Sequence, residues 1–134
     1  MTVVLDASAL VRLLDPETES AVGAALRDVS MVLAPDLIIA EVTSALWKYV
    51  THDKLSAADA ADKLDFAVDF VDRYHDLKDL AQEALREAAI HRHSVYDLYY
   101  AVLARREGAT ILTFDGRLKE LCGKMRIPLA DAQR

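Results

Sequence analysis

Two acidic residues in this sequence follow apolar runs that predict buried strands. Asp6 follows TVVL near the start of the chain, and Asp115 follows TILTF near its end. The carboxyl ends of parallel strands lie at one edge of a sheet, and such sheets bind their ligands beyond that edge. If the two strands are neighbours, Asp6 and Asp115 face each other in one acidic site.

Two further acids occupy unusual places in predicted helices. Glu41 lies in the helical segment 37–52, on an apolar stripe at helical spacing. A buried carboxylate is costly unless it is paired or holds a cation, although an acid at the edge of a stripe can also reach solvent. Asp97 lies among tyrosines and alanines in the segment 94–108, which indicates a carboxylate at a packed helix start.

A convergence of these four acids would have a chemical consequence. Two like charges ~4 Å apart cost about 4 kcal/mol at an effective dielectric near 20, so the cluster requires a neutralising cation. Carboxylate oxygens select hard ions, and bound Mg²⁺ or Mn²⁺ retains waters that can act as nucleophiles. The pattern therefore predicts metal-assisted hydrolysis of a phosphate ester.

Each of these acids also has a purely structural explanation. Aspartate is a favoured helix N-cap, and Asp6 and Asp115 both precede helical patterns. Ser94 and Asp97 have near capping-box spacing, although the usual partner of the serine is Glu or Gln. For one acid alone, capping is the commoner role. A catalytic site is favoured only because four acids are expected to lie together.

An alternating series of strands and helices would position the acids. The runs 2–5, 31–34 and 110–114 predict buried strands, and 75–77 and 127–130 predict weaker ones. Helical patterns occupy the segments 7–14, 17–29, 37–52, 56–74, 78–92, 94–108 and 116–124. This alternation predicts a single α/β domain over residues 1–134, a three-layer α/β/α sandwich with a mostly parallel sheet.

Composition limits the function further. The 134 residues are 53% apolar, which is enough for one core, and no stretch is apolar enough to span a membrane. The start of the chain lacks the basic region of a signal peptide, so we expect a cytoplasmic protein. A net charge of −6 argues against broad electrostatic capture of nucleic acid, so any nucleic-acid function requires a local site. The only cysteine, Cys122, is expected to be a core filler.

Four segments in order resemble the signature segments of PIN-domain ribonucleases, most closely the VapC-type toxins of bacterial and archaeal toxin–antitoxin pairs. They are VVLDASAL, DLIIAEVTSALWK, SVYDLYYAVLA and ILTFDGRL. Carried over by position, the acidic, metal-binding site of that family falls on Asp6, Glu41, Asp97 and Asp115, with Ser8 and Thr113 as supporting groups. The resemblance implies a PIN-like fold and an endoribonuclease that depends on Mg²⁺ or Mn²⁺. It also implies a homodimer that is silenced by an antitoxin, a small DNA-binding protein.

Basic and aromatic residues supply further candidates. We predict contacts to the RNA backbone from Arg12, His91, Arg92, His93 and Arg117. A metal site built from His91, His93, Glu83 and Glu87 is the weaker alternative, because polar groups at helical spacing usually form a solvated face. The aromatic and apolar residues of two helices are predicted to be core, with a groove for a partner as the alternative. They are Trp47, Tyr49, Val50, Phe66 and Phe70.

Other function classes fit less well. A phosphotransfer hydrolase with an aspartyl nucleophile would have a second acid where this chain has Ser8, and a response-regulator receiver would have a lysine where it has Phe114 and Asp115. A housekeeping PIN nuclease and a non-catalytic α/β interaction module, whose acids serve only as caps, stay open as alternatives.

Overall fold

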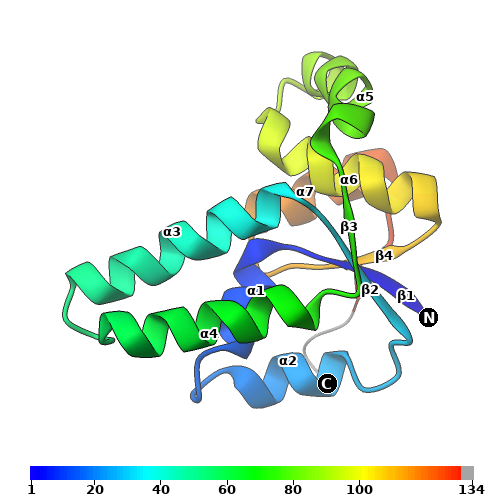
Figure 1. Ribbon diagram of the computed structural model, residues 1–134. Coiled ribbons are helices and arrows are strands. Elements are labelled where there is room, and N and C mark those ends of the chain that lie inside the picture. Colours follow the sequence, from blue (N-terminus) through cyan, green and yellow to red (C-terminus); the bar gives the residue numbers. More distant parts are fainter. Residues whose placement is uncertain (131–134) are drawn as a thin grey trace.

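The computed structural model describes residues 1–130 and is built around a parallel sheet (Figure 1). Its strands are β1 (Thr2–Leu5), β2 (Met31–Pro35), β3 (Arg73–His75) and β4 (Thr110–Leu112), in the order β3-β2-β1-β4. The predicted last strand is reduced to one bridge between Ile111 and Leu129. Residues 131–134 of the predicted domain lie outside the described residues.

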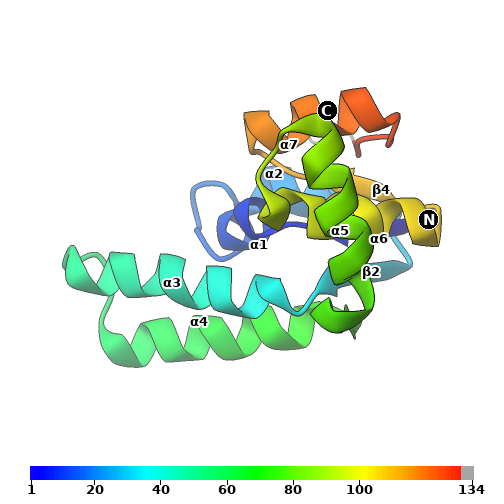
Figure 2. The same cartoon turned by 90° about the horizontal axis from the view of Figure 1, so that it is seen from above.

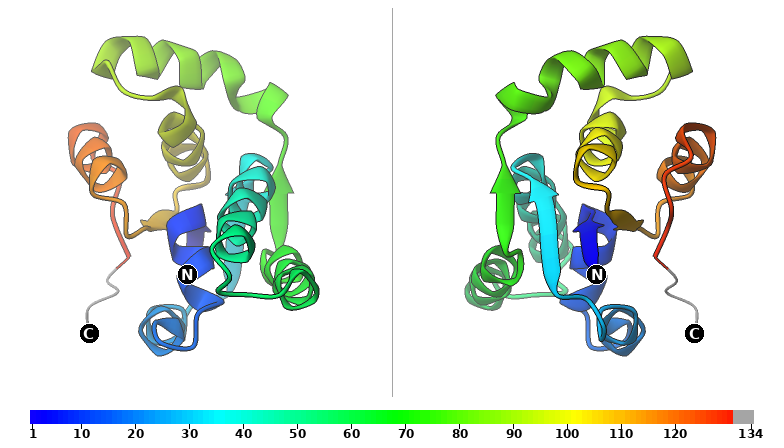
Figure 3. Two further views of the ribbon diagram at one scale, coloured as in Figure 1. Left: turned by 90° about the vertical axis from the view of Figure 1, so that its left-hand side faces the viewer. Right: turned by 90° about the vertical axis from the view of Figure 1, so that its right-hand side faces the viewer.

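Seven helices flank this sheet in the described part of the chain. They are α1 (Ala7–Leu13), α2 (Glu19–Ala25), α3 (Leu37–Thr51), α4 (Ala57–Phe70), α5 (Leu77–His91), α6 (Val95–Glu107) and α7 (Gly116–Met125). In Figures 1 and 3, α5 and α6 lie above the sheet, and α2 and α4 lie below it. The predicted α/β sandwich with a parallel sheet is therefore confirmed. Figure 2 shows α3 and α4 as a hairpin that projects to one side.

The order of the strands opens a crevice between β1 and β4. The chain passes from β1 through α1 and α2 to β2, whereas it reaches β4 from β3 through α5 and α6, on the other side of β1. A parallel sheet binds its ligands where the strand order reverses in this way. The register pairs Leu5 with Leu112, so Asp6 and Thr113 are the first residues beyond the two strand ends.

One predicted helix ends early because its last residues form a strand of the sheet. The pattern predicts a helix over 56–74, but α4 stops at Phe70 and residues 73–75 form β3. Asp72 makes this change of direction, because its amide donates to the Val32 carbonyl at 2.9 Å and its carboxylate accepts from the Val32 amide at 2.7 Å. The predicted N-cap at Ser56 is confirmed by its hydrogen bond from the Asp59 amide.

The core is centred on α6, which is buried on nearly all sides. This helix lies against β1, β2 and β4, and α5 and α7 pack on it from outside. Cys122 of α7 is buried, as expected of a core filler. The prediction of core is wrong for Trp47 and Phe66, which are 63% and 53% exposed on the α3–α4 hairpin. No helix among residues 1–130 has the length and apolar character needed to cross a membrane.

The position of α6 leads to a stability prediction. Leu103 is 1% exposed, so Leu103→Ala should lower the free energy of unfolding by about 2–5 kcal/mol, through lost burial and a cavity. The matched control is Leu85→Ala on α5, where the side chain is 66% exposed and the change should stay within about 0.5 kcal/mol. Urea denaturation of both variants measures the difference. Equal losses would contradict a core centred on α6.

Candidate active site

Asp6 is a buried carboxylate at the end of β1. It is 5% exposed and caps α1, because its Oδ1 accepts from the Ala9 amide at 3.0 Å. The same oxygen accepts from the Ser8 hydroxyl at 2.8 Å, and Oδ2 accepts from the Thr113 hydroxyl at 2.5 Å. The predicted cap is confirmed, and it coexists with a place in the crevice between β1 and β4.

Ser8 and Thr113 tie together the two turns that form this crevice. The Phe114 amide donates to the Ser8 hydroxyl oxygen at 2.9 Å, and the Asp115 amide donates to Thr113 Oγ1 at 3.0 Å. Thr113 is 4% exposed, and it and Asp6 are the buried polar residues of the described chain. Both hydroxyls therefore lie where supporting groups for Asp6 were predicted, and they hold its carboxylate in one orientation.

Asp115 follows β4 on the neighbouring turn. Its carboxylate caps α7 by accepting from the Arg117 amide at 2.9 Å, which confirms the second predicted cap. Unlike Asp6, Asp115 is exposed to solvent. The two ends of the sequence therefore bring one buried and one exposed carboxylate to the same edge of the sheet.

Glu41 approaches this edge from α3 and is held by a tyrosine of α6. Its Oε1 accepts from the Tyr100 hydroxyl at 2.5 Å, and Tyr100 is 2% exposed. The sequence pattern did not identify Tyr100 as a functional residue. Its spacing of three from Asp97 was the available signal, since residues three apart lie on one helix face.

Asp97 is oriented by the histidine before its helix. His93 Nε2 lies 2.7 Å from Asp97 Oδ2. Ser94 occupies the N-cap of α6 but makes no side-chain cap bond, so the structure does not contain the capping box considered as the alternative role of Asp97. Glu41 and Asp97 thus have no capping role, so capping accounts for only two of the four acids. Glu41 is half-buried, as expected also of an acid at the edge of an apolar stripe.

All four acids line one cleft of about 580 Å³, which we call the acid cleft. They come from the end of β1, from α3, from α6 and from the turn after β4. Tyr100 and Arg12 share the lining, and the Arg12 guanidinium lies over the Phe114 ring at 4.3 Å from its centre. Asp15 is a further lining acid that the sequence pattern did not single out.

The electrostatics of the acid cleft favour protonation or a bound cation. Burial raises the pKa of Asp6, and the negative charge of Asp115 adds to the rise, while hydrogen bonds from Thr113, Ala9 and Ser8 oppose it. Burial also raises the pKa of Glu41, and the other three acids add to this against the hydrogen bond from Tyr100. The pKa of Tyr100 is raised by burial and by Glu41, so its hydroxyl stays a donor.

The donor set fits a hard cation that keeps part of its water shell. The four acids offer oxygen ligands only, as Mg²⁺ and Mn²⁺ prefer. Within residues 1–130, no three acidic, histidine or cysteine side chains are gathered closely enough to ligate one ion together. Mg²⁺ is commonly bound through one or two carboxylates with waters in the remaining positions, and this arrangement suits the cleft.

The predicted basic contacts are scattered around the cleft. Arg12 lines it and His93 contacts Asp97, whereas Arg92 and Arg117 are exposed on the surface nearby. His91 pairs with Glu87 at 3.2 Å on α5. Their roles toward RNA stay predictions.

The alternative metal site on α5 is replaced by ion pairs. Arg105 contacts Glu83 at 2.8 Å and Glu87 at 3.1 Å, and Arg106 contacts Glu83 at 2.9 Å. The hydrogen bonds from these arginines lower the pKa of Glu83, although burial opposes them. The acids of this group are therefore compensated by cations, as expected of a helix face.

The chain is similar in sequence to known proteins. The family model described as the PIN domain matches residues 3–124. Ribonuclease VapC3 of Pyrobaculum aerophilum is 31% identical over 123 residues, which cover 90% of this chain and 94% of the relative.

Solved structures share the fold at lower identity. The toxin VapC20 of Mycobacterium tuberculosis, described as cleaving the sarcin-ricin loop, has a TM-score of 0.69 at 16% identity, over 88% of this chain and 93% of that one. VapBC2 of Rickettsia felis, solved with a DNA fragment from its promoter, has a TM-score of 0.67 at 18% identity, over 96% and 97% of the two chains. At these identities the likeness concerns the fold.

Proposed function

Because the chain belongs to the VapC ribonuclease toxin family of PIN domains, we propose that it is a metal-dependent endoribonuclease and the toxin of a toxin–antitoxin pair. The observation that carries the proposal is the convergence of Asp6, Glu41, Asp97 and Asp115 on the acid cleft. RNA phosphodiester bonds are hydrolysed there, in the cytoplasm.

The side chains of the acid cleft divide into cation ligands and residues that position them. Asp6, Glu41, Asp97 and Asp115 would hold Mg²⁺ or Mn²⁺ directly or through water. When bound, the ion would make a coordinated water easier to deprotonate, so that it can act as the nucleophile, and would neutralise negative charge on the phosphate. Ser8 and Thr113 orient Asp6, Tyr100 orients Glu41, and His93 orients Asp97.

Partner proteins belong to the same proposal. The VapBC2 structure is that of a toxin–antitoxin complex, and by analogy we expect a small DNA-binding antitoxin for this chain. Its amphipathic segment would anchor on the α3–α4 hairpin, where Trp47 and Phe66 are exposed. A homodimer is expected for this chain by the same analogy. Light scattering of the purified chain measures its oligomeric state.

Metal removal is the direct test of the activity. The purified protein should cleave RNA with Mg²⁺ or Mn²⁺ and lose at least about 10²-fold in rate after chelation by EDTA, because the water that attacks the phosphate is activated by the bound ion in this proposal. Gel analysis of labelled total RNA measures cleavage, and sequencing of the new RNA ends identifies the target.

Two controls accompany this test. Adding back Mn²⁺ after EDTA should restore cleavage, which separates metal loss from denaturation. Calorimetric titration with Mn²⁺ should show saturable binding that Asp6→Asn weakens, whereas Asp62→Asn on the exposed side of α4 leaves it unchanged. Cleavage that survives thorough chelation would exclude the metal mechanism. If the protein were only an interaction module, the calorimetric titration would show no saturable binding of Mn²⁺.

A further inference from the structure

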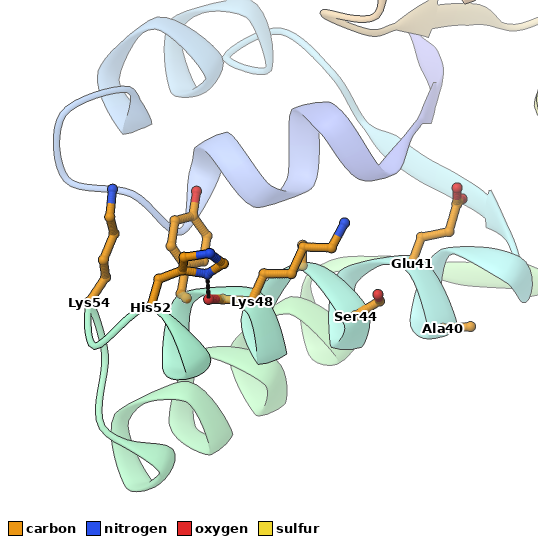
Figure 4. A pocket seen from close by; sticks show the side chains of 8 residues that line it. Ala40, Glu41, Ser44, Lys48, His52 and Lys54 are labelled. Atoms are coloured by element: carbon orange, nitrogen blue, oxygen red, sulfur yellow. Dashed lines mark hydrogen bonds between the residues drawn. The ribbon is translucent and has the colours of Figure 1, made fainter.

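A second, larger hollow continues from the acid cleft along α3. We call this hollow, which has a volume of about 720 Å³, the α3 groove (Figure 4). Its lining includes Glu41, Ser44, Lys48, His52 and Lys54. Glu41, Ala45 and Tyr49 follow one another along α3 at intervals of four residues and line both the groove and the acid cleft, so the two hollows adjoin along this row. A ligand that occupies the acid cleft can therefore extend directly into the groove.

Helical periodicity places these residues in one row. Glu41, Ser44, Lys48 and His52 recur at intervals of three and four residues, which keeps them on one face of α3. Lys48 lies two turns beyond Glu41, roughly 10 Å along the helix axis. In Figure 4 the side chains of Lys48 and Lys54 point to the same side of α3 as Glu41.

The charge of the groove is opposite to that of the cleft. Glu41 is its single acid, and Lys48 and Lys54 form no ion pair with any residue between 1 and 130. Both lysines are exposed in a protein whose net charge is −6. Uncompensated cations beside an acidic centre attract a ligand that is anionic along its length.

We infer that the α3 groove is the path along which a single RNA strand leaves the acid cleft, with its phosphates against Lys48 and Lys54. The inference rests on the proposed ribonuclease function and adds two positioning residues, neither of which the sequence pattern had indicated. A strand bound this way reads phosphates rather than bases, so the contacts raise affinity without selecting a sequence.

The test is a double variant, Lys48→Gln with Lys54→Gln, measured in two assays. Fluorescence anisotropy in EDTA, with a short labelled single-stranded RNA of mixed sequence, measures binding without cleavage. We expect affinity to fall roughly tenfold and the slope of log affinity against log salt to shrink by about 1.4, at ~0.7 for each lost phosphate contact. Cleavage kinetics with Mg²⁺ should show KM raised roughly tenfold and kcat changed less than about twofold.

A charge-matched control removes two lysines elsewhere. Lys78→Gln with Lys124→Gln, on α5 and α7, loses the same charge on exposed positions and should leave the salt slope and KM close to wild type. If both double variants weaken binding equally, the effect is one of net charge and the path is wrong. It is also wrong if the α3 variant keeps wild-type affinity and KM but loses inhibition by the antitoxin, because the groove then holds the protein partner.

The two assays separate this inference from the proposed function. A protein that cleaves RNA with an unchanged KM in the α3 variant would retain the ribonuclease proposal and overturn the path. RNA binding that depends on Lys48 and Lys54 in a protein that never cleaves would support the path and overturn the nuclease.

Discussion

Asp6→Asn is expected to reduce RNA cleavage by about 10²–10⁴-fold, because it removes the most buried of the four charges in the acid cleft. Asparagine has nearly the same shape, and its carbonyl oxygen can still accept from the Ala9 amide, so the cap on α1 is largely kept. Cleavage of a labelled RNA at saturating Mg²⁺ measures the loss. Asp62→Asn on α4 is the matched control and should cleave like wild type.

The stability of the same variant should change in the opposite direction. Burial raises the pKa of Asp6, and a carboxyl whose pKa is raised on folding costs stability as the pH rises from its ordinary value of 3.8 through the raised one. Asp6→Asn lacks that cost. In EDTA its free energy of unfolding relative to wild type should therefore increase as the pH rises above 3.8.

If Asp6 had only a structural role, the Asp6→Asn variant would behave differently. Loss of a cap and of the hydrogen bond from Thr113 would destabilise the variant at every pH, while cleavage would persist. Denaturation in EDTA at several pH values distinguishes the two cases. A large loss of stability together with retained cleavage would remove Asp6 from the catalytic site.

Expression of the wild-type chain alone is expected to arrest growth of its host. An unregulated ribonuclease degrades cellular RNA, so culture density should stop rising and cleaved RNA should accumulate. Asp97→Asn should abolish the arrest, because it removes a cleft acid that has no capping role and cuts activity by about 10²-fold or more. Growth curves and RNA gels after induction measure both effects.

Co-expression tests the control of this activity. The neighbouring open reading frame should restore growth if it encodes an antitoxin, and an arginine of its C-terminal segment could pair bidentately with the cleft acids and compete with the cation. Asp62→Asn should remain toxic. If the wild-type chain is harmless at high expression and leaves RNA intact, the toxin proposal fails, and a housekeeping nuclease or a non-catalytic interaction module becomes the better explanation.

The sequence by itself determined the alternating scaffold and the acids that it carries. Apolar runs before Asp6 and Asp115 predict strands buried on both faces, because only such strands lack polar alternation. Two such strands in a parallel sheet bring their ends to one edge, whatever the length of chain between them. The caps at Asp6, Ser56 and Asp115 were also predictable, since a cap depends on residues within three positions of it.

Only the tertiary structure decided which side chains complete the site. The bond between Tyr100 and Glu41 joins two helices that are 59 residues apart in sequence, and no local pattern specifies such a pair. The exposure of Trp47 and the path from helix to strand at Asp72 likewise depend on which neighbours each segment meets. Periodicity reports that a helix has an apolar face, but the packing of the helix against its neighbours decides which polar residues at its edge line a cleft. For that reason the acids could be found in the sequence, whereas Lys48 and Lys54 became candidates only when the structure showed that they line a groove beside the acid cleft.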